Sequence, residues 1–151
     1  QERLELAERF GANETISLAD HPEPADRVAR VQELTDGVGA DMVLEVTGVP
    51  ASFVEAIDLA RVNGRIASVG NLNAEASVTM TPGILTRKSV HVQGVLRYHP
   101  WYLQKAIRFL ARRQHLHPFE AFTDRSYPLA EVTDALKAGE SRSVARVAIV
   151  P

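Results

Sequence analysis

The 151-residue chain has the length of one ordinary domain, with 45% hydrophobic residues, 24% charged residues and a net charge of −2. This balance gives no electrostatic reason to expect nucleic acid or an anionic membrane as a partner. The absence of cysteine excludes disulfides, thiolate catalysis and a sulfur-based zinc site within these residues, and it fits a cytoplasmic location. No apolar run approaches the roughly 20 residues that a membrane span needs. Because the chain starts with Gln1 rather than Met, we expect it to begin inside a longer protein.

The first forty residues predict two helices and a short strand. Apolar residues at helical spacing predict a helix that ends at Gly11, and the run 15–18 predicts a strand. A second helix is expected with Asp26 as its cap, and the glycines of 36–39 end it.

The middle of the chain alternates strands and helices. The run 41–46 is almost continuously apolar, which is typical of a strand covered by helices on both faces. A helix starting at Pro50 and a strand over 65–70 follow after short connections. Strand, helix and parallel strand form a right-handed crossover unit. The chain is therefore expected to be an α/β protein with a doubly wound, Rossmann-type parallel sheet.

Beyond residue 71 the pattern changes to more widely spaced elements. We expect a helical turn at 81–87, a strand at Ser89–Leu96, helices at 100–113 and 130–138 with 124–128 leading into the second of them, and a closing strand at 145–150. We place a domain boundary where the sheet pattern ends, which gives domains of residues 1–96 and 97–151.

Two predicted strands end in small residues, Val46-Thr47-Gly48 and Val69-Gly70-Asn71. In a doubly wound sheet, ligands bind at the carboxyl ends of the strands. Glycine at these ends lets a flat ring approach the backbone, because no Cβ intrudes. The alternative is that these glycines serve only the tight turns after the strands.

Five segments also occur in a familiar order and spacing: 2–12, 39–48, 64–70, 88–98 and 139–151. On these segments the chain resembles the C-terminal part of the zinc-type medium-chain dehydrogenase/reductase family, which includes alcohol, sorbitol and threonine dehydrogenases. The resemblance implies that the first two strands of the sheet and the glycine-rich pyrophosphate turn lie upstream of Gln1. It also implies that residues 97–151 return to pack with a catalytic domain outside the chain.

The resemblance implies a nicotinamide cofactor, NAD with NADP left open, and a set of residues that bind it. Arg3 would lie near the adenosine ribose, and Arg146 would reach the pyrophosphate, with Arg142 as an alternative. The strand ends would line the adenine pocket and support the nicotinamide, with main-chain groups holding its carboxamide. The implied cofactor-binding residues are Arg3, Val46, Thr47, Gly48, Val49, Val69, Gly70, Asn71, Val95, Leu96, Arg97 and Arg146. Arg3 and Arg146 have the simpler alternative of exposed surface charges.

The segment Gly94-Val95-Leu96-Arg97-Tyr98 is similar to the sorbitol dehydrogenase version of this strand end. It implies a secondary alcohol or polyol as substrate, contacted by Asn71, Leu96, Arg97 and Tyr98, although 99–102 departs from that pattern. Hydride would pass between the alcohol and NAD, and the zinc ligands would lie outside this chain. No catalytic or metal-binding residue is expected within it, and residues 1–151 alone are expected to be inactive. The strand Ser89–Leu96 is expected to pair with its twin in a homodimer or homotetramer.

Several alternatives stay open at this point. One is a zinc-independent, quinone-reductase-type member of the same superfamily, and another is a nucleotide-binding module without catalysis. His115, His117 and Glu120 have superficial metal-ligand spacing in a loop. Short-chain dehydrogenase chemistry is not among them, because it needs tyrosine and lysine four residues apart and Tyr102 and Lys105 are three apart.

Overall fold

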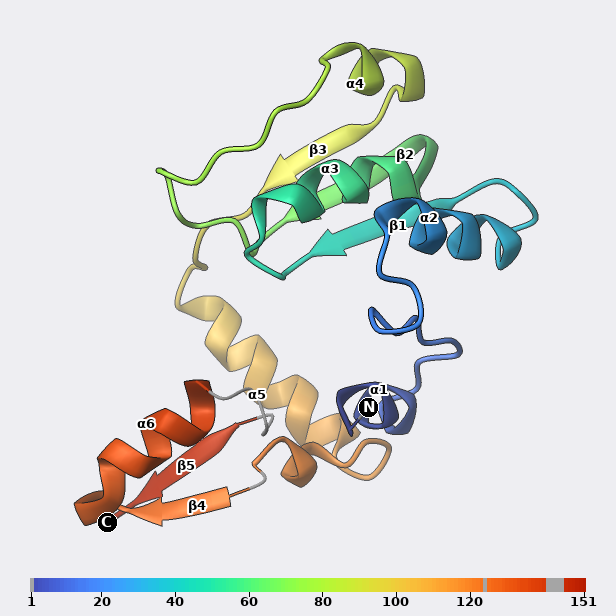
Figure 1. Cartoon of the computed structure of the whole chain (residues 1–151). Helices are drawn as coiled ribbons and strands as arrows, with labels where there is room; N and C mark the ends of the chain where they lie inside the picture. Colours follow the sequence, from blue (N-terminus) through green and yellow to red (C-terminus); the bar gives the residue numbers. More distant parts are fainter. Residues whose placement is uncertain (1, 124, 141–145) are drawn as a thin grey trace. The chain divides into compact units, whose positions relative to one another are not determined.

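The structure, a computed structural model, describes residues 2–123, 125–140 and 146–151 and contains two compact units. We call Leu18–Tyr98 the sheet unit, and residues 1–17 together with 99–151 the tail unit. The elements, labelled in Figure 1, are α1 (Glu2–Arg9), α2 (Pro24–Glu33), β1 (Ala40–Glu45), α3 (Pro50–Leu59), β2 (Ala60–Ser68), α4 (Gly83–Lys88), β3 (His91–Gly94), α5 (Trp101–Arg113), the 3₁₀ turns η1 (Phe119–Phe122) and η2 (Leu129–Glu131), β4 (Arg125–Pro128), α6 (Val132–Glu140) and β5 (Val147–Val150).

The sheet unit is built on a three-stranded parallel sheet in the order β1-β2-β3. The register pairs Val43 of β1 with Ile66 of β2, and Ile66 with Val92 of β3. A shift in register between Ala40 and Met42 accommodates the turn at Asn63, whose φ is +60°. The α/β class with a parallel sheet, expected from the alternation of strands and helices, is confirmed.

The core of the sheet unit lies between α3 and one face of this sheet (Figure 1). Ile57 of α3 and Ile66 of β2 are fully buried there, and Phe53 and Val43 pack around them. The helices α3 and α4 both contribute to this face, since Ile84 of α4 contacts the same cluster.

The other face of the sheet differs from the expectation of helices on both sides. Met42 and Leu44 point to this other face, because alternate residues of a strand lie on the same side of the sheet. They are 59% and 64% exposed. Within the sheet unit the apolar run 41–46 is therefore covered on one face.

Two polar contacts hold the helices of this unit together. Lys88, the last residue of α4, donates from Nζ to the carbonyl oxygens of Ile57, Asp58 and Ala60, at 2.9, 2.6 and 2.8 Å. These carbonyls lie at the C-terminal end of α3, where helical carbonyls lack partners within the helix. Arg27 of α2 forms a two-point ion pair with Glu55 of α3 at 2.6 and 2.7 Å.

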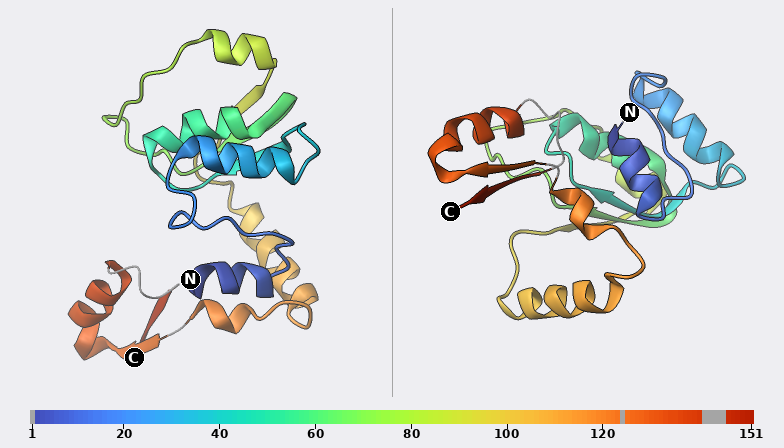
Figure 2. Two further views of the ribbon diagram at one scale, coloured as in Figure 1. Left: turned by 45° about the vertical axis from the view of Figure 1, so that its right-hand side comes forward. Right: turned by 90° about the horizontal axis from the view of Figure 1, so that it is seen from below.

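The tail unit contains the parallel pair β4–β5 and a cluster of aromatic rings. Ala135 of α6 is fully buried, and α6 lies alongside β5, drawn in red in Figure 2. The ring of Phe10 stacks on those of His117 and Phe122, with centroids 5.8 and 4.5 Å apart. Residues Arg125–Pro128, which were expected to lead into a helix, do precede η2 and α6, and they also form the strand β4, because β5 offers them a partner strand.

Two further expectations were wrong. Residues 15–18 form no strand, since no strand of the described residues lies beside them to complete the hydrogen bonds. The helix expected to be capped by Asp26 is α2, and its N-cap is Glu23, with Pro24 at the first helical position. Proline is favoured there because its fixed φ suits the helix and its missing N–H costs nothing.

The sheet unit ends at Tyr98, close to the predicted boundary near Arg97, while residues 2–17 belong to the tail unit. The division into domains of residues 1–96 and 97–151 stays a prediction.

Candidate functional site

The carboxyl ends of the three strands meet at one edge of the sheet, and two glycines allow the closest contact there. A Cβ added to Gly70, after β2, would lie 2.4 Å from the nitrogen of Gly48 and 2.6 Å from the carbonyl carbon of Val46, after β1. The third strand joins them, because Val95 donates its N–H to the carbonyl oxygen of Ser68 at 2.9 Å. The strand ends singled out in the sequence therefore lie together.

Glu45, the last residue of β1, is the polar centre of this edge and is only 3% exposed. Its Oε1 accepts hydrogen bonds from the N–H and the hydroxyl of Thr47 at 2.8 and 2.7 Å, and lies 2.9 Å from the hydroxyl of Ser52. Its Oε2 accepts from the side-chain amide of Asn71 at 2.7 Å. The main-chain oxygen of Glu45 accepts from the N–H groups of Val69 and Gly70 at 2.8 and 3.0 Å.

These contacts decide the charge of the Glu45 carboxyl. Burial alone raises the pKa of a carboxyl group, but hydrogen bonds from Thr47, Ser52 and the N–H of Gly48 outweigh it and lower the pKa of Glu45 from 4.5 to about 2. The group is therefore an anion at neutral pH, and an anion accepts hydrogen bonds without donating any.

The surface around this edge is apolar and open. Val46 is 65% exposed and Leu96 is 74% exposed, and Val49 and Val69 are also partly accessible. Gly48 has a φ of +76°, which glycine adopts without strain. Exposed valine and leucine side chains beside a glycine backbone fit the flat, partly apolar rings of a dinucleotide.

Arg97 and Tyr98 follow β3 and are exposed to solvent. Arg97 has a φ of +55°, a left-handed conformation that residues other than glycine rarely adopt. Such conformations gather at ligand-binding sites, where the surrounding structure maintains them.

The main-chain hydrogen bonds show which groups at this edge are already used. The N–H groups of Val69 and Val95 donate within the fold, to Glu45 and Ser68. The resemblance implies that main-chain groups of these residues bind the carboxamide of a nicotinamide. Because their N–H groups are already used, their carbonyl oxygens would make that contact.

The remaining residues expected to bind the cofactor lie in the tail unit. Arg3 lies in α1, and Arg146 directly precedes β5, where it is exposed to solvent. Arg142, the alternative to Arg146, lies outside the described residues.

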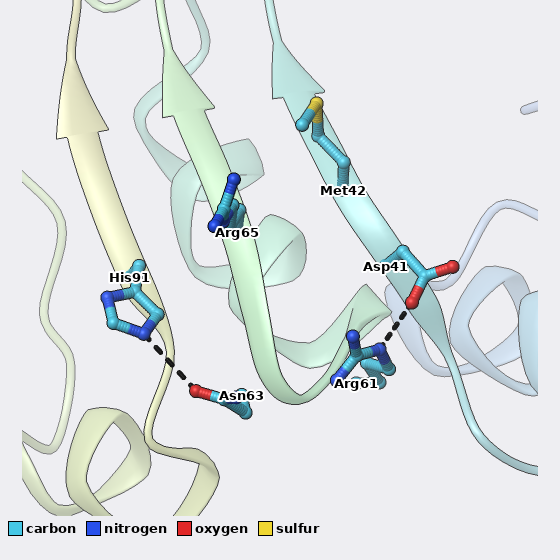
Figure 3. A pocket seen from close by; sticks show the side chains of 6 residues that line it. All are labelled: Asp41, Met42, Arg61, Asn63, Arg65 and His91. Atoms are coloured by element: carbon cyan, nitrogen blue, oxygen red, sulfur yellow. Dashed lines mark hydrogen bonds and ion pairs between the residues drawn. The ribbon is translucent and has the colours of Figure 1, made fainter.

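A hollow of about 360 Å³ lies at the opposite, amino-terminal end of the strands (Figure 3). Asp41 and Arg61 form an ion pair across its rim, and His91 lies 3.2 Å from the side-chain oxygen of Asn63. These polar groups satisfy one another in pairs, and ligands of doubly wound sheets bind at the other end of the strands. The carboxyl edge is therefore the candidate site.

Of the two histidines in the loop 115–117, His117 contributes to packing, whereas His115 is exposed. His117 stacks on Phe10 and meets Phe119 edge-on, at 5.8 and 5.7 Å between centroids. Within residues 2–123, 125–140 and 146–151, no group of three or more histidine, aspartate or glutamate side chains is placed to hold a metal ion. A search of the same residues finds no helix with the length and apolarity of a membrane span.

Sequence reasoning missed two members of the site, Glu45 and Ser52. The sequence does contain a signal for Glu45, which is a single carboxylate within an apolar strand. Because such a residue is almost never fully buried unless it is paired, its position predicts nearby hydrogen-bond donors. Its partners Thr47 and Ser52 follow within seven residues, as polar groups able to donate to it.

Comparisons with known proteins agree with this geometry. The family model for zinc-binding dehydrogenases matches residues 1–112. The chain is 32% identical over 135 residues to 5-exo-hydroxycamphor dehydrogenase from Pseudomonas putida, covering 89% of this chain and 37% of that protein. It is 29% identical to sorbitol dehydrogenase from Halalkalibacterium halodurans, covering 100% of this chain and 42% of the relative.

Among solved structures, an alcohol dehydrogenase from Thermotoga maritima superimposes with a TM-score of 0.89 at 26% identity, over 99% of this chain and 40% of that one. The chain thus spans about two fifths of the length of these relatives, all of which are oxidoreductases by name. Because the family model covers most of the sequence and the strand ends meet as that fold requires, the chain belongs to the zinc-binding dehydrogenase family.

Proposed function

We propose that this chain binds NAD at the carboxyl edge of β1, β2 and β3, within a dehydrogenase that oxidises a secondary alcohol to a carbonyl. The observation that carries the proposal is the contact of Gly70 with Gly48, which brings two strand ends together beside exposed apolar side chains. Residues 1–96 would form part of the dinucleotide-binding domain, and 97–151 would pack with the catalytic domain.

The chain's own contribution would be to orient the cofactor. Val46, Thr47 and Val49 would line the adenine side, while Val69 and Gly70 would support the nicotinamide ring. Main-chain groups at Val69, Val95 and Arg97 would hold the carboxamide, the first two through their carbonyl oxygens, each hydrogen bond contributing about 1 kcal/mol. Together these bonds would fix which face of the ring meets the substrate. When bound, the cofactor supplies the hydride acceptor.

We assign zinc to ligands outside this chain, as the resemblance to zinc-type dehydrogenases implies. No acid, base or metal ligand of the reaction is assigned to this chain. Its residues would act by binding and orientation alone.

A polyol or another polar secondary alcohol is the proposed substrate class. Arg97 and Tyr98 are exposed after β3 and could donate hydrogen bonds to substrate hydroxyls, with Leu96 and Asn71 beside the same edge. The similarity to a sorbitol dehydrogenase supports this choice.

The test is cofactor binding by the full-length protein. We expect NADH fluorescence to change on binding, and ADP-ribose, which lacks the nicotinamide, to compete for the same site. A protein that binds neither NADH nor NADPH would exclude the proposal. Turnover of polyols and of simple aliphatic alcohols, compared at saturating NAD, distinguishes the substrate classes.

For Arg146 we expect a role at the cofactor pyrophosphate. Arg146→Ala should raise the KM for NAD about tenfold or more, because a charge-assisted contact to phosphate contributes roughly 1.5–3 kcal/mol. Arg125→Ala is the matched control, since Arg125 is exposed on β4, in register with Val147 of β5. An unchanged KM in Arg146→Ala would remove the assignment.

We also propose a homodimer or homotetramer formed through the strand predicted at Ser89–Leu96. Within the described residues β3 lies at one edge of the three-stranded sheet, and pairing with a twin would cover that edge. Sedimentation of the full-length protein should give at least twice the monomer mass, and a monomer at micromolar concentration would contradict this.

A further inference from the structure

The carboxylate of Glu45 links two loops by assigning one oxygen to each. Oε1 receives donors that follow β1, which are the N–H and hydroxyl of Thr47 in the loop and the hydroxyl of Ser52 in the first turn of α3. Oε2 receives a donor from the loop after β2, the side-chain amide of Asn71 at 2.7 Å. The side chain of Glu45 is thus held at both oxygens. Turning its carboxylate would break the hydrogen bonds from Thr47 and Ser52 as well as the one from Asn71.

This arrangement determines how the amide of Asn71 is oriented. An ionised carboxylate only accepts hydrogen bonds, so the Nδ2 group of Asn71 must face Glu45. The amide oxygen, Oδ1, then points away from Glu45. Asn71 is itself an exposed residue.

We infer that Asn71 presents Oδ1 as a hydrogen-bond acceptor to a hydroxyl group of the bound ligand, and that Glu45 is the positioning residue that holds it in this orientation. The inference rests on the proposed function, which places the loop 69–71 on the nicotinamide side. The hydroxyl belongs either to the ribose of the cofactor or to the alcohol substrate, and the two are separable by experiment.

The structure suggests exchanging the donor and acceptor of this pair. In Asn71→Asp, two carboxylates face each other at hydrogen-bond distance and repel. In Glu45→Gln, the new amide donor faces the amide donor of Asn71, so Asn71 must turn over and present Nδ2 to the ligand. In the double variant, the introduced glutamine donates to the introduced aspartate, whose second oxygen again accepts from the ligand.

Affinities of the full-length protein for NADH and ADP are the measurements. If the hydroxyl belongs to the ribose on the nicotinamide side, each single variant should raise the Kd for NADH about tenfold, and the double variant should return it to within about threefold of the wild type. The Kd for ADP, which lacks the ribose on the nicotinamide side, should change by less than about twofold throughout, which also shows that each variant is folded. If the hydroxyl belongs to the substrate, the same pattern should appear in kcat/KM for the alcohol, at unchanged NADH affinity.

Asn73→Asp is the matched control, because Asn73 lies two residues further along and its Oδ1 accepts from the N–H of Glu75, within its own loop. An aspartate oxygen accepts the same hydrogen bond, so this variant should leave all three measurements unchanged. A double variant as impaired as the worse single variant would overturn the inference, as would single variants indistinguishable from the wild type. A wild-type protein that binds neither NADH nor NADPH would instead exclude the proposed function, and this inference with it.

Discussion

Replacing Gly70 by alanine in the full-length protein is expected to abolish NADH binding and to lower the free energy of unfolding by about 3 kcal/mol or more. The added methyl group would lie 2.4 Å from the nitrogen of Gly48 and 2.7 Å from that of Thr47. Both neighbours are backbone atoms, which cannot rotate aside as a side chain can. The loops after β1 and β2 would therefore have to separate, and the candidate site would open with them.

Gly83→Ala is the matched control within the same sheet unit. Its nearest neighbour would be a methyl group of Thr81 at 3.8 Å, an ordinary contact distance, at the start of α4. We expect its stability to stay within about 1 kcal/mol of the wild type, since alanine also restricts the unfolded chain. Urea unfolding followed by circular dichroism compares the variants, and a Gly70→Ala protein as stable as the control would show that the contact is not tight.

Acid should weaken the same edge of the sheet through Glu45. Its pKa is about 2 in the folded protein and 4.5 without these contacts, so its contribution to stability is fully present above pH 4.5 and is lost as the pH falls toward 2. The difference corresponds to about 3 kcal/mol, because a protonated carboxyl gives up hydrogen bonds that the anion accepts. The free energy of unfolding of the wild type should therefore fall by about this amount over that range from this group alone.

Glu45→Gln isolates this contribution, because glutamine keeps the shape of the side chain but does not titrate. At pH 7 the variant should be less stable than the wild type, since an amide cannot accept from both loops at once. Toward pH 2 the two proteins should converge. Parallel curves from pH 7 to 2 would show that Glu45 does not carry the expected charge.

The sequence predicted the central strands and helices because their signals are local. The apolar run before Thr47-Gly48 and the helix starting at Pro50 lie where they were expected. The prediction of a strand at 15–18 was wrong, because a strand forms only beside a partner strand. The pattern of apolar residues within the segment does not show whether such a partner is present. The N-cap of α2 is Glu23 rather than the predicted Asp26, because proline is favoured at the first helical position, which Pro24 occupies.

The candidate site was predicted in its location but not in its centre. Glycines after two strands indicated the edge, and the structure brings Gly48 and Gly70 into contact. The importance of Glu45 depends on Asn71, which lies 26 residues away along the chain, and that proximity follows only from the pairing of β1 with β2. A hydrogen bond between segments this far apart along the chain cannot be recognised from the spacing of residues in the sequence.

The way Lys88 is held has a practical consequence for chemical labelling. The chain's other lysines, Lys105 and Lys137, are exposed on α5 and α6, whereas the ammonium group of Lys88 is bound by three carbonyl oxygens. An amine-reactive reagent needs the free amine, which Lys88 can offer only by releasing α3. Dyes and surface linkers should therefore attach at positions 105 and 137 first, and modification at 88 would report that the two helices have come apart.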